Sequence, residues 1–93
     1  MKVIFKCNNM IVNKHSEGGR YNGYSNPFGE HIPAVGDYVL LGEHTKEFTH
    51  MEYTPMKKYI VLSRTFSAVE DYNNSYSKQT CVVELEYLEN AVI

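Results

Sequence analysis

The chain has 93 residues, of which 43% are hydrophobic and 22% charged, and it carries a formal net charge of -2. This size predicts a single domain over 1–93 with one modest core. The slight acidic excess disfavours binding to a phosphate backbone, and the longest apolar run is far shorter than the ~20 residues of a membrane-spanning helix. We therefore expect neither a nucleic-acid partner nor a membrane partner.

The N-terminal segment "KVIFKC", 2–7, has apolar residues at every second position and predicts a strand. Residues 10–12 either continue this strand or pair with it across Asn8 and Asn9, because asparagine enters left-handed backbone conformations readily. Lys6 and the two asparagines end the apolar stretch too early for a secretion signal. We therefore expect a cytoplasmic protein.

The segment 13–34 is rich in Gly, Asn, Ser and Pro and predicts a loop. Long loops in small domains are usually binding elements or disordered. This one sets Arg20, Tyr21, Tyr24 and Phe28 among four glycines, a combination typical of protein-contact surfaces. Two alternatives stay open: the aromatic side chains fold back and cap one end of the core, or they stack the bases of a single-stranded nucleic acid.

Gly36 and Asp37 precede the apolar segment 38–41, which predicts the next strand. Asp37 is either a reactive carboxylate at the strand end or the last residue of a turn. The turn is favoured, because Gly36 supplies backbone freedom and an aspartate accepts local backbone hydrogen bonds. We expect Val39 and Leu41 to enter the core.

The segment 43–58 lacks strand periodicity. Phe48 and Met51 are three residues apart and Pro55 would end a helix, so a short helix is one interpretation. Its His, Thr and Tyr residues are middling helix formers, so an irregular loop is the other interpretation.

The clearest strand signal comes from 58–66 and 80–89, which predict an antiparallel hairpin. A two-residue turn at Asn73 and Asn74 gives the opposed pairs Phe66–Cys81, Arg64–Val83, Leu62–Leu85 and Ile60–Tyr87. This register gathers apolar side chains on one face, whereas a shift by one residue would place Leu62 opposite Glu86. The segment 67–79 is polar enough to fray into a longer loop, which would release the register from the turn.

These elements predict an all-β fold with at most one short helix, either a small barrel or a strongly bent antiparallel sheet of about five strands. The succession "VGDYVLL", "KYIVLSR", "TCVVELE" resembles small SH3-like barrels over about half the chain. That resemblance implies an architecture and no function, because such barrels host many unrelated functions.

Arg64 is unusual because the preferred register places it on the apolar face, where a charge needs water or a partner. Three arrangements satisfy it. Its side chain reaches water near a sheet end, it pairs with Asp37 or a glutamate, or it binds a ligand inside a barrel mouth.

Motifs for catalysis, phosphate binding or zinc binding are missing from the sequence. The four histidines, His15, His31, His44 and His50, lack ligand spacing, and Glu84 and Glu86 have the spacing of a solvated strand face. Without a secretion signal, Cys7 and Cys81 are expected to be buried thiols rather than a disulfide. We therefore expect no enzymatic activity, no metal and no cofactor.

The sequence favours a small non-enzymatic interaction protein that binds a protein partner through 13–34. The expected binding residues are Arg20, Tyr21, Tyr24, Phe28 and Arg64. The apolar tail 91–93 and open sheet edges also suggest a homodimer. Abundant Asn, Lys, Tyr and Ile suggest AT-rich coding, and with it a bacterial or phage accessory protein.

Two alternatives from other classes are retained. A single-stranded nucleic-acid-binding β-barrel would use Arg20 and the same aromatic residues, with Lys57, Lys58 and Arg64 nearby, and its affinity would fall steeply with salt. An enzyme would place His15 or His31 beside a carboxylate in a pocket.

Overall fold

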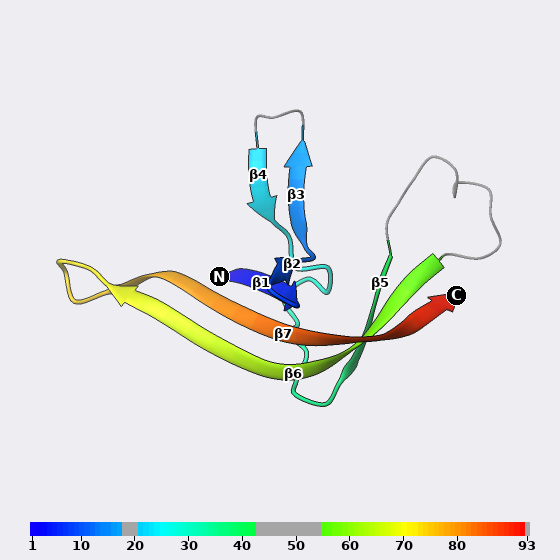
Figure 1. The fold of residues 1–93 in the computed structure, drawn as a ribbon. Helices are drawn as coiled ribbons and strands as arrows, with labels where there is room; N and C mark the ends of the chain where they lie inside the picture. The colour runs from blue at the N-terminus through cyan, green and yellow to red at the C-terminus, as the bar shows by residue number, and fades with distance from the viewer. Residues whose placement is uncertain (18–20, 43–54, 93) are drawn as a thin grey trace.

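The computed structural model describes residues 1–17, 21–42 and 55–92, and these residues form strands and turns without a helix (Figure 1). A mixed sheet has the strand order β2-β1-β7-β6-β5. Its strands are β1 (Lys2–Cys7), β2 (Met10–Ile11), β5 (Tyr38–Gly42), β6 (Pro55–Glu70) and β7 (Tyr76–Val92). A separate hairpin pairs β3 (Lys14–Glu17) with β4 (Tyr21–Tyr24).

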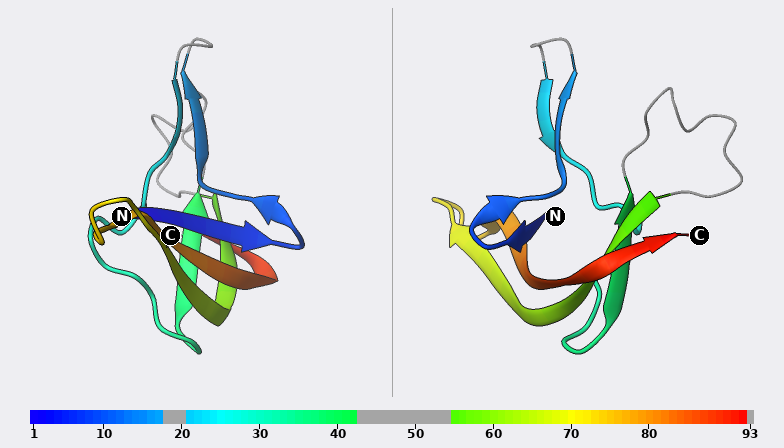
Figure 2. Two further views of the ribbon diagram at one scale, coloured as in Figure 1. Left: turned by 90° about the vertical axis from the view of Figure 1, so that its left-hand side faces the viewer. Right: turned by 45° about the vertical axis from the view of Figure 1, so that its right-hand side comes forward.

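The predicted all-β class is confirmed, and the sheet is strongly bent (Figure 2). The SH3-like barrel is not confirmed, because the sheet of the described residues stays open with β2 and β5 at its two edges. Of the segment 43–58, residues 55–58 belong to β6, which begins at Pro55, the residue expected to end the short helix. Residues 43–54 lie outside the described part of the chain.

The sheet is mixed because β1 lies parallel to β7, from Lys2↔Thr80 to Cys7↔Leu85. The sequence predicted antiparallel pairing, and alternation alone cannot identify a distant parallel partner. Directly opposed residues of neighbouring strands point to the same face of a sheet. The pairing therefore brings the alternating apolar side chains of both strands onto one face.

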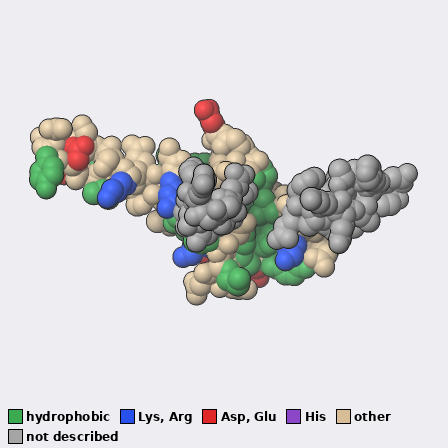
Figure 3. Space-filling view, turned by 90° about the horizontal axis from the view of Figure 1, so that it is seen from above, with side chains coloured by type: hydrophobic (Ala, Val, Ile, Leu, Met, Phe, Trp, Pro, Cys, Tyr) green, Lys and Arg blue, Asp and Glu red, His purple; other side chains and the backbone are tan. Residues whose placement is uncertain are grey.

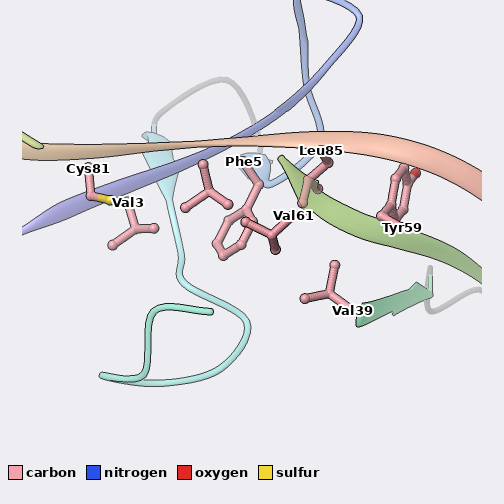
Figure 4. Close-up of a cluster of buried hydrophobic side chains, with 8 residues drawn as sticks. Val3, Phe5, Val39, Tyr59, Val61, Cys81 and Leu85 are labelled. Atoms are coloured by element: carbon pink, nitrogen blue, oxygen red, sulfur yellow. The ribbon is translucent and has the colours of Figure 1, made fainter. Parts of the chain in front are cut away.

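That face carries the core, whose side chains converge on one side of the sheet (Figure 4). The buried hydrophobic residues are Val3, Phe5, Val39, Tyr59, Val61, Cys81, Val83 and Leu85. The connection between β4 and β5 covers part of this face, with Phe28 and Ile32 packed against the cluster. The expectation that Val39 and Leu41 enter the core is confirmed, Val39 as a buried member and Leu41 as a half-buried neighbour.

The first hairpin follows the predicted tight turn at Asn8 and Asn9. Cys7 lies opposite Met10, and the two asparagines adopt φ angles of 50° and 65°. Positive φ at both central residues is the geometry that hairpin turns of two residues require, and asparagine tolerates it better than most residues.

The register of β6 against β7 confirms half of the predicted pairs. Phe66 lies opposite Cys81 and Arg64 opposite Val83, as predicted. Beyond them Leu62 is an extra residue, because Val61 faces Leu85 and the next paired residue of β6 is Ser63. Such a bulge reverses which residues of the strand point inward.

The predicted pairs Leu62–Leu85 and Ile60–Tyr87 are therefore wrong. Val61 is 1% exposed, whereas Leu62 is 52% exposed. The buried β6 residues before the bulge are Tyr59 and Val61, and Tyr59 meets Tyr87 edge to face with ring centroids 5.8 Å apart.

The turn between β6 and β7 spans 71–75 and is longer than the predicted pair Asn73 and Asn74. Asp71 organises it: Oδ1 accepts hydrogen bonds from the N–H groups of Asn73 at 2.9 Å and Ser75 at 3.1 Å. Asn74 adopts a φ of 60°. An aspartate at this position favours a compact turn, because its carboxylate satisfies backbone donors of the following residues.

Two hairpins project from the body of the molecule, the β3–β4 hairpin and the far end of the β6–β7 ribbon (Figures 1 and 2). The radius of gyration is 15.4 Å, against about 12 Å expected for a compact chain of this length. The molecule is therefore more extended than a compact chain of the same length.

Both cysteines are free thiols, as predicted; Cys81 is buried and Cys7 half-buried. Burial raises the pKa of the Cys81 thiol above the ordinary value of 9.0, and the positive charge of Arg64 lowers it by a smaller amount. The folded chain thus holds this proton more tightly than the unfolded chain. The resulting contribution to stability is present below pH 9 and is lost as the pH rises through the raised pKa.

We expect a thiol-specific reagent at pH 8 to modify Cys7 first and Cys81 only as the chain unfolds. Mass spectrometry of the singly labelled protein after digestion checks this order. In denaturant both thiols should react at similar rates. Equal rates in the folded protein would contradict the burial of Cys81.

Candidate functional site

The segment 13–34 contains the β3–β4 hairpin, so the prediction of an unstructured loop is wrong for 14–17 and 21–24. Lys14 pairs with Tyr24 and Glu17 with Tyr21. The strand sequences "KHSE" and "YNGY" lack the alternation of a strand with one buried face. A hairpin that satisfies its backbone hydrogen bonds internally and stands away from the core does not need that alternation.

The base of this hairpin is fixed by Asn13, a buried polar residue that is 6% exposed. Its Oδ1 accepts a hydrogen bond from the Phe5 N–H at 2.9 Å. Its Nδ2 donates to the Val3 carbonyl at 2.8 Å and the Ser25 carbonyl at 3.0 Å. The side-chain amide thus acts as a peptide group that extends the β1 edge and ties both ends of the hairpin to it.

Sequence reasoning did not identify Asn13. Asparagine is common in loops, and no pattern marks the one whose amide enters the sheet. A buried amide of this kind is stable when its donors and acceptor are satisfied, as the three hydrogen bonds of Asn13 show.

Phe28 is positioned by a compact turn that begins at Asn26. The Asn26 Oδ1 accepts from the Phe28 N–H at 2.9 Å, and its Nδ2 donates to the His31 carbonyl at 2.9 Å. The ring of Phe28 meets Phe5 edge to face, with centroids 5.9 Å apart. For this one aromatic residue the capping arrangement is observed.

Two other expected contact residues of this segment lie on β4. Tyr21 and Tyr24 are the first and last residues of β4, on the strand that returns from the hairpin tip. Arg20 lies outside the described part of the chain. The backbone thus places the two tyrosines on the projecting hairpin, apart from Phe28 on the core.

Arg64 lies on β6 opposite Val83, and its side chain is exposed. The guanidinium carbon lies 5.8 Å from the centroid of the Phe66 ring. Within the described residues it forms no ion pair with Asp37 or with a glutamate, so that alternative is not the one observed. The arrangement in which Arg64 reaches water is the one observed.

Asp37 closes a turn, as the favoured interpretation predicted. Its N–H donates to the Ala34 carbonyl at 3.0 Å, and its Oδ2 accepts from the Ala34 N–H at 2.8 Å. Gly36 adopts a φ of 91° at the third position of this turn. Two backbone hydrogen bonds join this turn to Val61 of β6. The Gly36 N–H donates to the Val61 carbonyl and the Val61 N–H donates to the Asp37 carbonyl, each at 2.9 Å.

Replacing Gly36 with alanine is expected to lower the free energy of unfolding by about 1 to 2 kcal/mol, because a Cβ is unfavourable at this positive φ. Nothing lies within 4 Å of the added Cβ, so the cost is conformational. Gly36→Asn should lose less, since asparagine tolerates left-handed conformations. Denaturant unfolding compares the variants, and equal losses would contradict this explanation.

A surface pocket beside Phe28 is lined by Phe28, His31, Pro33, Asp37, Tyr38 and Val39. It therefore contains a histidine and a carboxylate, the pair that the enzyme hypothesis requires. The described hydrogen bonds of Asp37 serve the turn, and none joins it to His31. The pocket has the residue types for acid–base chemistry without a contact that couples them.

The described residues contain no group of three or more His, Cys, Asp or Glu side chains that could hold a metal ion. Within the same ranges, no helix is present that is long and apolar enough to cross a membrane. The chain matches no family model, no curated protein sequence and no solved structure.

Proposed function

We propose that the protein is a non-enzymatic interaction module that binds a protein partner through 13–34, with the β3–β4 hairpin as the contact element. The observation that carries this proposal is the clamp at the hairpin base. Asn13 bonds to both β1 and Ser25, so the hairpin leaves the sheet from a fixed point (Figure 1).

A fixed base is useful for recognition. A two-stranded hairpin alone is marginally stable in water, and ordering it at the moment of binding would reduce affinity. The Asn13 hydrogen bonds hold its two ends together before any partner arrives. Tyr21 and Tyr24 belong to β4, and Arg20 precedes them directly in the sequence; arginine and tyrosine often dominate the binding energy of protein interfaces.

The nucleic-acid alternative has less support. It counts Lys58 among its cations, yet the Lys58 ammonium lies 4.0 Å from Glu89 Oε1 and 4.5 Å from the centroid of the Tyr38 ring. A cation engaged in this way is less available to a phosphate. We therefore expect no measurable affinity for single-stranded oligonucleotides at low salt, where such binding would be strongest.

The enzyme alternative has less support, because no described hydrogen bond couples His31 to Asp37 in the pocket beside Phe28. A bacterial or phage accessory role is consistent with an interaction module. This role is inferred from the abundance of Asn, Lys, Tyr and Ile in the sequence.

The test is the triple variant R20A/Y21A/Y24A, used with the wild-type chain to capture partners from a lysate of the source cells. We expect the variant to lose the captured protein while its unfolding midpoint changes by no more than a few degrees. The control is Y72A/Y76A, which removes two exposed tyrosines from the other projecting hairpin. Undiminished capture by the triple variant, or a large loss of its stability, would overturn the proposal.

A further inference from the structure

A second surface, independent of the 13–34 segment, lies on the far end of the β6–β7 ribbon. We call it the β6–β7 arm and define it as 62–70 of β6, the turn 71–75 and 76–79 of β7. Almost every side chain along it is exposed, including Phe66 at 56% and Val69 at 53%. Figure 3 shows hydrophobic, basic and acidic side chains along this projecting end.

The arm has two strand edges, and they differ. On the β7 side, β1 pairs from Thr80 onward, and the uncovered residues before it include a bulge at Lys78, whose φ is 52°. A lysine and a bulge are common devices that keep another strand from pairing with an edge. Pairing of another strand with the β7 edge is thus disfavoured.

The β6 edge of the arm has no such protection beyond the bulge where it begins. In the described part of the chain, β5 covers β6 only up to Ile60, and Val61 bonds to the turn at 36–37. The stretch "SRTFSAVE", 63–70, contains no Gly, Pro or Lys, and its Thr65, Phe66 and Val69 favour strands. Each outward N–H and C=O along it is available to another strand.

We propose that this edge pairs with the same edge of a second copy of the chain, in an antiparallel two-fold dimer that joins the two sheets. The choice of a second copy rests on self-complementarity. In a two-fold antiparallel pair, the numbers of two opposed residues must both be odd or both be even. The reason is that only every second residue points its N–H and C=O groups outward.

Centring the pair on Ser67 satisfies this requirement and matches the side chains. Arg64 then lies opposite Glu70 of the second copy, and by symmetry the contact occurs twice. Phe66 lies opposite Ala68, a large side chain against a small one, and Thr65 opposite Val69. Opposite charges directly across a strand pair stabilise it, and like charges destabilise it.

The neighbouring even registers are poorer. Centring on Phe66 places Leu62 opposite Glu70 and leaves Arg64 opposite Ala68. Centring on Ala68 places Phe66 opposite Glu70. Within the described residues neither Arg64 nor Glu70 has an ion-pair partner in its own chain, so both charges are available for the dimer.

The dimer should be weak and dependent on concentration. A strand pair of seven residues a side buries less than the roughly 1,600 Å² of a standard interface. The interface lies apart from the proposed partner contact at 13–34, so either proposal can fail while the other stands.

Sedimentation equilibrium of the full chain over a concentration series tests the proposal. We expect a monomer–dimer equilibrium whose dissociation constant rises about tenfold in R64E and in E70R, because each change places like charges opposite twice. The double variant R64E/E70R should restore the wild-type value. K57E, an equal charge change at an exposed residue beside β5, should leave the constant unchanged.

A wild-type chain that stays monomeric at the highest concentrations would overturn the proposal. A dimer that the single variants leave intact would also overturn it, as would the absence of rescue in the double variant. Circular dichroism of each variant confirms folding, which we expect to persist because the changed residues are exposed and outside the core.

Discussion

Truncating Phe5 to alanine is expected to remove about 4 kcal/mol from the free energy of unfolding, the usual range for a fully buried aromatic residue. Phe5 is 0% exposed and lies opposite Val83 in the parallel β1–β7 pair. Its ring also supports Phe28 from the connection that covers the core. The loss therefore combines lost burial, an internal cavity and a loosened cover.

A domain of this size has a total stability of about 5 to 15 kcal/mol, so the Phe5→Ala substitution should remove roughly a quarter to four-fifths of it. The midpoint of thermal unfolding should fall by about 20 °C. Tyr72→Ala is the control, because Tyr72 is an aromatic residue with its side chain fully in solvent, and its loss should shift the midpoint little. Similar midpoints for the two variants would contradict the assignment of the core.

Replacing Asn13 with aspartate is expected to cost about 3 kcal/mol at neutral pH. The Nδ2 donor to Val3 and Ser25 becomes a carboxylate oxygen that faces two carbonyl oxygens at about the same distance. The shape of the side chain hardly changes, so the cost reports the hydrogen bonds. Denaturant unfolding measures it, with the exposed Asn73→Asp as the control for the added charge.

The loss in Asn13→Asp should also depend on pH. Burial and the two carbonyls disfavour the charged form of the introduced carboxyl, so its pKa is raised in the folded chain. A raised pKa contributes stability below the unfolded value of ~3.9 that is lost as the pH rises. The variant should therefore approach the wild type near pH 4. A loss that is independent of pH would contradict the clamp.

The strands and turns with strong local signals were predictable. The alternation in β1, the positive-φ turn at Asn8 and Asn9, and the turn closed by Asp37 are each encoded by a few neighbouring residues. The pairs Phe66–Cys81 and Arg64–Val83 follow from the hydrophobic pattern near the end of the hairpin. All of these features are local.

The features that the sequence did not reveal depend on the rest of the fold. Leu62 looks like a core residue until a bulge turns it outward and sends Val61 inward. The parallel partner of β1 is chosen by packing across the whole chain. The β3–β4 hairpin has no buried stripe to mark it, and Asn13 differs from other loop asparagines only through its three tertiary hydrogen bonds.

The two proposed binding surfaces both lie outside the buried core. The buried residues belong to β1, β5, β6 and β7 near the centre, while the β3–β4 hairpin and the β6–β7 arm extend from it (Figure 2). Dimerisation through the arm would present two hairpins at once and strengthen binding to a repetitive partner.

The most direct test of the proposed function removes the β3–β4 hairpin. Residues 14–24 are exchanged for an Asn-Gly turn between Asn13 and Ser25. These two residues are already close, because the Asn13 Nδ2 donates to the Ser25 carbonyl at 3.0 Å. We predict that this chain folds with nearly the wild-type unfolding midpoint and captures none of the protein that the full chain captures from the source lysate. Capture that persists in the folded, hairpin-free chain would contradict the assignment of the β3–β4 hairpin as the contact element.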